Sequence, residues 1–217
     1  QVLAKALKGD GGHYLEVLKV LSQSLADKSL LFYFQDDKLE KKVAGYGWAG
    51  EIKEAPGDYL AIIHSNISGG KTDTVMEEKV SHQAEIDRDG NITDTLTITR
   101  QHNGILGDPF TGFKNVDYLR VYVPLGSQLL SASGFMEPAP GLFAPVPAEY
   151  QADDDLTKVA GKVIVDSLSK TDISSEFGKT VFGNWVQTEV GETSIVILKY
   201  RLSFKLPLAK IRQEKNW

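Results

Sequence analysis

The chain has no cysteine among its 217 residues. This absence excludes disulfide bonds, thiol catalysis and cysteine-ligated zinc. No apolar run reaches the roughly 18 residues that a membrane-spanning helix requires. The chain shows no signal peptide and starts at Gln1 rather than Met, so we expect a fragment or a processed product of a longer protein.

An excess of positive charge is also missing. The formal net charge is −5 at pH 7, whereas binding to nucleic acid or to an anionic membrane requires a basic surface. The apolar content of 41% and the charged content of 24% are ordinary for a globular protein. The composition therefore indicates a folded chain with no nucleic-acid partner.

The known spacings of catalytic and metal sites are absent as well. No Gly-x-Ser-x-Gly elbow of a serine hydrolase occurs. The four histidines have no mutual metal-ligand spacing, and we expect His82 to be a core residue because it falls on an alternating apolar face. The sequence thus predicts no catalytic residue, no metal ligand and no cofactor.

What the sequence does contain is strand patterning. Apolar residues fall at every second position from Val196 to Phe204, which predicts a strand with one buried face and with Lys199 and Arg201 toward solvent. Similar alternation surrounds Asp89-Gly90, a pair that favours a type I′ hairpin turn with two positive φ angles. Further strands are predicted at Tyr59–His64, Tyr118–Pro124, Lys162–Ser167 and Val181–Val186.

The first 50 residues have helical periodicity instead. An amphipathic helix is predicted over residues 13–27, and a second from Asp36 or Asp37 through Ala44, where Gly45 would end it. A shorter helix is predicted at Val2–Lys8. The apolar run Leu30–Phe34 predicts a strand covered on both faces.

Gly134–Asp155 contains four prolines within ten residues and ends in three aspartates. Proline removes backbone donors, so we predict a long surface loop here. Together these patterns predict an α+β fold. A helix-containing α/β part over residues 1–75 precedes an antiparallel immunoglobulin-like β-sandwich over 76–205, and 206–217 form a tail.

Two short segments resemble ligand loops without matching them. Ser65–Thr72 has the Gly-Lys-Thr end of a phosphate-binding P-loop, but serine replaces its first glycine and no helical stripe follows. We therefore predict no nucleotide binding and a glycine-rich turn with positive φ at Gly69 and Gly70, although Lys71 and backbone N–H groups there could hold an anion. Asp87–Asn91 lacks the glycine and glutamate positions of a calcium loop, so a hairpin turn explains it.

Trp48 lies among glycines, where an aromatic ring either closes the end of a core or stacks on a sugar or a partner. Under the second interpretation, we expect the binding residues to be the following: Trp48, Asn66, Gly69, Gly70, Lys71 and Asp73.

Several segments, in order along the chain, resemble the carboxy-terminal part of a bacterial family called domain of unknown function 4012. The likeness spans roughly residues 28–204. It is carried by Leu30–Asp36, Gly47–Gly50, Asp58–Leu60, Asn66, Gly69–Lys71, Asp73, Tyr118–Pro124, Ser131–Gly134, Gly178–Gly183 and Tyr200–Leu202.

The resemblance implies a protein on the extracellular face of a bacterial cell envelope, tethered by a membrane helix upstream of this chain. It implies a non-catalytic module that binds an envelope glycopolymer or a surface protein. Alternatively, the chain is the accessory half of an envelope glycopolymer transferase, whose catalytic part would be an upstream segment similar to LytR-CpsA-Psr phosphotransferases.

Overall fold

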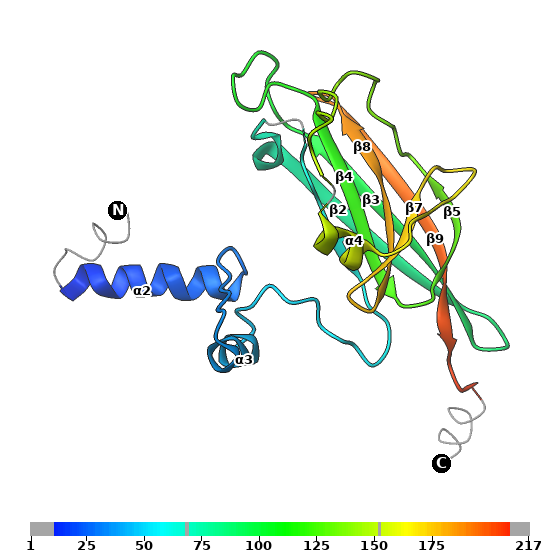
Figure 1. The fold of residues 1–217 in the computed structure, drawn as a ribbon, viewed down its shortest axis with the longest axis horizontal. Helices are drawn as coiled ribbons and strands as arrows, with labels where there is room; N and C mark the ends of the chain where they lie inside the picture. The colour runs from blue at the N-terminus through cyan, green and yellow to red at the C-terminus, as the bar shows by residue number, and fades with distance from the viewer. Residues whose placement is uncertain (1–10, 68–69, 152, 209–217) are drawn as a thin grey trace. The chain divides into compact units, whose positions relative to one another are not determined.

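The computed structural model describes residues 11–67, 70–151 and 153–208, and the chain divides into two compact units, Gln1–Glu54 and Ala55–Trp217 (Figure 1). The division lies earlier than residue 75, where the sequence placed it. The reason is that strand β1 (Ala61–Ile63) pairs with β4 (Asn115–Pro124) and so belongs to the second unit.

The first unit contains helices α2 (Gly11–Ala26) and α3 (Asp37–Gly45), and both were predicted. The Asp36 carboxylate accepts hydrogen bonds from the N–H groups of Lys38 and Leu39, which caps α3 as expected. Helix α3 ends at Gly45, as predicted, but the positive φ that follows a helix end is taken by Gly47, at 75°. The short helix predicted at Val2–Lys8 lies outside the described residues.

The strand predicted at Leu30–Phe34 is wrong. Only Phe32 forms a bridge, to Ala49, and Tyr33 is 80% exposed. In the part of the chain that the structure describes, no sheet of the first unit covers this run, so its apolar character does not produce a buried strand.

The second unit is built from two antiparallel sheets. One has the order β1-β4-β8-β7-β6 and the other β2-β3-β9-β5. The remaining strands are β2 (Met76–Ile86), β3 (Asn91–His102), β5 (Gln128–Ser133), β6 (Ile164–Val165), β7 (Asp172–Glu176), β8 (Lys179–Thr188) and β9 (Thr193–Lys205). The α+β class is therefore confirmed, although β5 and β7 were not predicted.

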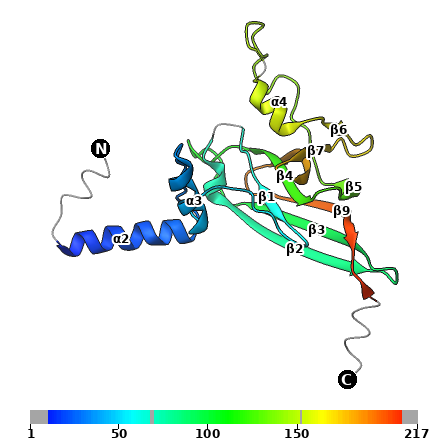
Figure 2. The ribbon, with the colours of Figure 1, turned by 60° about the horizontal axis from the view of Figure 1, so that its bottom comes forward.

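One hydrophobic core lies between the sheets, which Figure 2 shows as two layers. The core contains side chains of β3 and β9 packed against those of β4 and β8. The ring centroids of Phe182 and Tyr200 lie 5.8 Å apart. The alternation predicted for β9 is confirmed: Val196, Leu198, Tyr200 and Leu202 are buried, Phe204 packs against the core, and Arg201 is exposed.

The predicted hairpin at Asp89-Gly90 joins β2 to β3, as expected. Its turn type is different. Only Gly90 has a positive φ (79°), and the Gly90 N–H donates to the Asp87 carbonyl, which makes a four-residue loop rather than a type I′ turn. A Cβ on Gly90 would overlap the carbonyl oxygen of Leu206, so only glycine fits.

Strand β2 is an edge strand, and most of its residues are exposed, including Val80 at 42% and Ile86 at 51%. The prediction that His82 is a core residue is therefore wrong, since its side chain is 28% exposed. The opposite strand β1 has only three residues, too few to cover the whole of β2.

The proline-rich segment is largely irregular and exposed, as predicted, but its end is not a loop. The Asp153 carboxylate caps a short helix, α4 (Asp154–Ala160). Among the described residues, no helix combines the length and apolar character needed to cross a membrane.

Candidate functional site

The outer face of the five-stranded sheet is polar and aromatic. On β4, Tyr118, Arg120 and Tyr122 alternate with the buried Leu119 and Val121, so they point away from the core. Neighbouring strands add Asp172, Ser174 and Glu176 from β7, and Val181, Gly183 and Trp185 from β8.

A hydrogen bond crosses β8 on this face. The Tyr118 hydroxyl donates to Asp172 Oδ2 at 2.6 Å, and Gly183 of β8 lies between the two strands that carry them. A Cβ on Gly183 would lie 2.6 Å from the Tyr118 hydroxyl oxygen, so glycine is what allows the ring to pass. Burial and the Asp172 hydrogen bond raise the pKa of Tyr118 well above its ordinary value.

A second bond of the same kind lies two residues along β4. The Tyr122 hydroxyl donates to Glu176 Oε2 at 2.6 Å, and burial together with this bond raises the pKa of Tyr122 to about 12. The Arg120 guanidinium lies 3.6 Å from the same carboxylate. The Arg120 Nε atom is buried and has no hydrogen-bond partner among the described residues.

Three aromatic rings gather beside these polar groups. Trp185 contacts Tyr118 edge-to-face at 5.0 Å and Phe143 at 5.5 Å. Phe143 belongs to the proline-rich segment, which is fastened to β8 because Met136 N–H donates to the Trp185 carbonyl and Gln187 Nε2 donates to the Met136 carbonyl. The segment thus carries a ring to the outer face of the sheet.

The rings and polar groups line a cavity of about 620 Å³. A neighbouring cavity of about 370 Å³ shares Tyr118, Asp172 and Trp185 with it. A third, of about 230 Å³, shares Trp185 and Phe143. Trp185 therefore stands where three adjoining hollows meet, which forms an extended surface rather than one closed pocket.

The loop predicted as a binding site is fastened to the protein by its own polar groups. Asn66 Nδ2 donates to Thr72 Oγ1 at 2.8 Å, and Asn115 Nδ2 donates to both Thr72 Oγ1 and Asp73 Oδ1. Thr72 and Asn115 are fully buried. Asn66 and Asp73 are thus brought together through a network that holds the loop in place.

Gly70 and Lys71, the residues expected to hold an anion, are occupied by contacts within the protein. The Lys71 N–H donates to the Phe110 carbonyl at 2.7 Å, so that donor is already used. A Cβ on Gly70 would lie 3.2 Å from the Phe113 ring and 3.3 Å from the Phe110 carbonyl oxygen, so little space for a ligand remains at this glycine. Gly69 lies outside the described residues. The chain continues into η1 (Thr72–Val75) and β2, rather than into the α-helix that follows a P-loop.

A buried charge cluster adjoins this loop. Asp117, fully buried, accepts from Arg100 Nη1 at 2.9 Å and from Ser65 N–H at 2.6 Å, and lies 2.7 Å from His64 Nδ1. His64 Nε2 also lies 2.9 Å from Glu78. Burial disfavours the charged ring, but the hydrogen bonds with Asp117 and Glu78 outweigh that effect and raise the pKa of His64 to about 9.

Trp48 belongs to the first unit, whereas the other predicted binding residues belong to the second. Its ring stacks on that of Tyr46 at 4.9 Å, and its carbonyl accepts the Phe32 N–H. Trp48 is partly buried and Tyr46 is 69% exposed, and the binding role of Trp48 stays a prediction.

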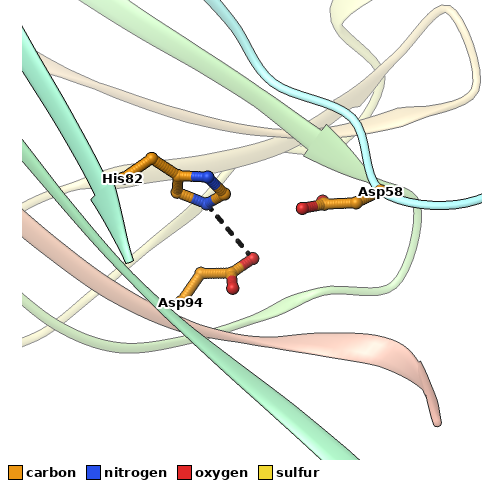
Figure 3. Close-up of side chains that lie close together, drawn as sticks. All are labelled: Asp58, His82 and Asp94. Carbon is orange, nitrogen blue, oxygen red and sulfur yellow. Dashed lines mark ion pairs between the residues drawn. The ribbon is translucent and has the colours of Figure 1, made fainter. Parts of the chain in front are cut away.

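One group of described side chains could hold a metal ion, namely Asp58, His82 and Asp94 (Figure 3). Each offers one ligand atom, and these atoms all lie within 4.8 Å of one another. The sequence predicts no metal ligands here, because the three residues are separated along the chain and share no motif.

The alternation along β3 contains a signal for several of these residues. On β3 every second residue from Ile92 to His102 is buried, and this set includes Asp94, Arg100 and His102. Three ionisable residues at the period of a core-facing strand indicate internal polar clusters. Trp185 and Tyr118 had no comparable signal, because their contact depends on β4 and β8 being neighbours.

Comparison of this chain with protein-family models, with curated proteins and with solved structures found no match. The family resemblance therefore stays a prediction.

Proposed function

We propose that this chain is a non-catalytic module of the bacterial cell envelope that binds a glycopolymer on the outer face of its five-stranded sheet. The observation that carries the proposal is the aromatic group Tyr118, Phe143 and Trp185 at the junction of three adjoining cavities. The envelope location rests on the family resemblance. We also propose that the two sheets form an immunoglobulin-like sandwich, which their antiparallel pairing supports.

The chemistry of the surface suits a sugar chain. Aromatic faces pack against the C–H faces of sugar rings, while ring hydroxyls need both donors and acceptors. Asp172 and Glu176 supply acceptor oxygens, and the partly exposed Arg120 guanidinium supplies donors from its terminal nitrogens. Because the hollows adjoin one another, they can contact successive units of a polymer, whereas a single enclosed cavity would suit a small molecule.

The test is a binding screen of the purified chain against envelope polysaccharides, with affinities measured by calorimetry. We expect Trp185→Ala to weaken binding at least tenfold, because it removes the ring shared by all three cavities. Trp48→Ala is the matched control, since it removes the same side chain from the other unit, and it should leave the affinity unchanged.

Thermal melts of both variants separate lost binding from lost folding. The proposal fails if no envelope polysaccharide binds at millimolar concentration, or if Trp48→Ala abolishes binding while Trp185→Ala does not. New reducing ends appearing during incubation would contradict the non-catalytic part of the proposal.

A further inference from the structure

Asp94 is a buried carboxylate without a hydrogen bond. It lies on the core-facing side of β3 and is 0% exposed, and neither of its carboxylate oxygens has a hydrogen-bond partner among the described residues. A buried polar group in this state is costly, so its retention calls for a specific explanation.

The side chains around Asp94 add negative charge and a metal-binding nitrogen. His82 Nε2 of β2 lies 3.4 Å from Asp94 Oδ2, and Asp58, just before β1, points toward the same space (Figure 3). In the described ranges, no lysine or arginine forms an ion pair with Asp58 or Asp94.

The charge cluster at the other end of the β2–β3 hairpin gives an internal comparison. There too a buried aspartate, Asp117, lies beside a histidine and a second carboxylate, but the Arg100 guanidinium occupies the cluster and donates to Asp117. The Asp58, His82 and Asp94 group has the same acidic and imidazole composition without that cation.

We infer that Asp58, His82 and Asp94 form a binding site for one divalent transition-metal ion, best matched by Zn²⁺. One imidazole and two carboxylates are a ligand set that zinc accepts, whereas Ca²⁺ and Mg²⁺ prefer oxygen ligands alone. Bonds of about 2.0–2.1 Å place tetrahedral zinc ligands roughly 3.3 Å apart, close to the 3.4 Å between His82 and Asp94.

Asp58 can act as the third ligand of the site. The Asp58 and His82 residues are exposed while Asp94 is buried, so an ion can enter from the solvent side and meet Asp94 at the inner side. Asp58 Oδ1 accepts the Tyr59 N–H at 2.8 Å, which leaves its other oxygen for the metal. The bound ion would join the segment before β1 to the β2–β3 hairpin, and β1 and the hairpin belong to different sheets.

The test is calorimetric titration of the EDTA-treated and desalted full chain with Zn²⁺. We expect one ion per chain and a higher melting temperature with zinc. Asp58→Asn and His82→Gln should each weaken binding at least tenfold. Asp94→Asn changes a buried group and can lower stability by itself. Its zinc affinity is therefore interpreted only together with the affinities of Asp58→Asn and His82→Gln.

His64→Gln is the matched control, since it removes the other histidine that lies between two carboxylates, and zinc affinity should stay within twofold. The inference is overturned if Zn²⁺ does not bind at 1 mM (a concentration of about this order marks weak association), or if His64→Gln abolishes binding while His82→Gln does not. Binding of Ca²⁺ in preference to Zn²⁺ would also overturn it. Replacement by Co²⁺ should give visible absorption bands that are lost in His82→Gln.

Discussion

Gly183 has only a hydrogen atom at the position where any other residue would place a Cβ against the Tyr118 side chain. In most strands, replacing glycine by alanine is stabilising by about 0.4–1 kcal/mol, because it reduces the freedom of the unfolded chain. Here the new methyl group must displace Tyr118 from Asp172. We expect Gly183→Ala to lower the free energy of unfolding by about 1–3 kcal/mol, measured by denaturant melts.

A double-mutant cycle identifies the cause. In a Tyr118→Phe background the hydroxyl is absent, so the same Gly183→Ala change should cost at least about 0.5 kcal/mol less. Strictly additive effects would show that the cost of the methyl group arises elsewhere.

His64 gives the protein a pH dependence of known sign. Its pKa is raised from 6.5 to about 9 in the folded state, so the ring favours folding when protonated. This stabilisation is complete below about pH 6.5 and is lost as the pH rises through about 9. We expect wild-type stability to fall by at most about 3 kcal/mol across this window, in chemical melts at successive pH values.

His64→Gln should flatten that part of the profile, because glutamine does not titrate. An equally steep decline in the variant would assign the pH dependence to other groups.

At the scale of single elements, β9 offers the sharpest contrast between adjacent positions. Leu198 is fully buried in the core, whereas the Lys199 side chain is 44% exposed and lies 3.8 Å from Glu85. Leu198→Ala should cost about 2–5 kcal/mol through lost burial and a cavity. Lys199→Ala should change stability by less than about 0.5 kcal/mol, since exposed ion pairs contribute little. Similar losses in the two melts would contradict the assigned faces.

Patterns within one strand were predicted well because the pleat alone determines them. The five apolar positions of β9 followed from a period of two, and Asp89-Gly90 located a turn although its type was wrong. The same period on β3 carried Asp94 and Arg100 to the core side, but a rule that assigns only apolar residues to the interior overlooks them.

Features that depend on neighbours could not be predicted from one sequence. The Tyr118–Asp172 bond requires β4, β8 and β7 to be adjacent, and the strand order is set by tertiary packing. The strand predicted at Leu30–Phe34 was wrong because it too depends on neighbours. The apolar run is present, but no sheet of its own unit pairs with it among the described residues. The candidate site therefore came from the structure. The sequence pattern predicted two of its strands, β4 and β8, but not β7.

At the scale of the whole molecule, the two units differ in how much core they bury. Of the described residues in Gln1–Glu54, Ala49 is the only buried apolar residue, whereas Ala55–Trp217 contains the whole core cluster between the sheets. Helices of this length gain most of their stability from packing, so α2 and α3 contribute little on their own.

We therefore expect removal of residues 1–54 to leave the β unit nearly as stable as in the full chain. Its melting temperature, followed by near-ultraviolet circular dichroism of Trp185 and its aromatic neighbours, should change by less than about 2 °C, because a loss of 1 kcal/mol would already shift it by about 2–4 °C at this size. Far-ultraviolet spectra should lose helical signal before that transition in the full chain and not in the shortened one. A drop in melting temperature of more than about 5 °C, or an insoluble product, would contradict this expectation. Because the core cluster lies within Ala55–Trp217, such a result would mean that the first unit stabilises the second.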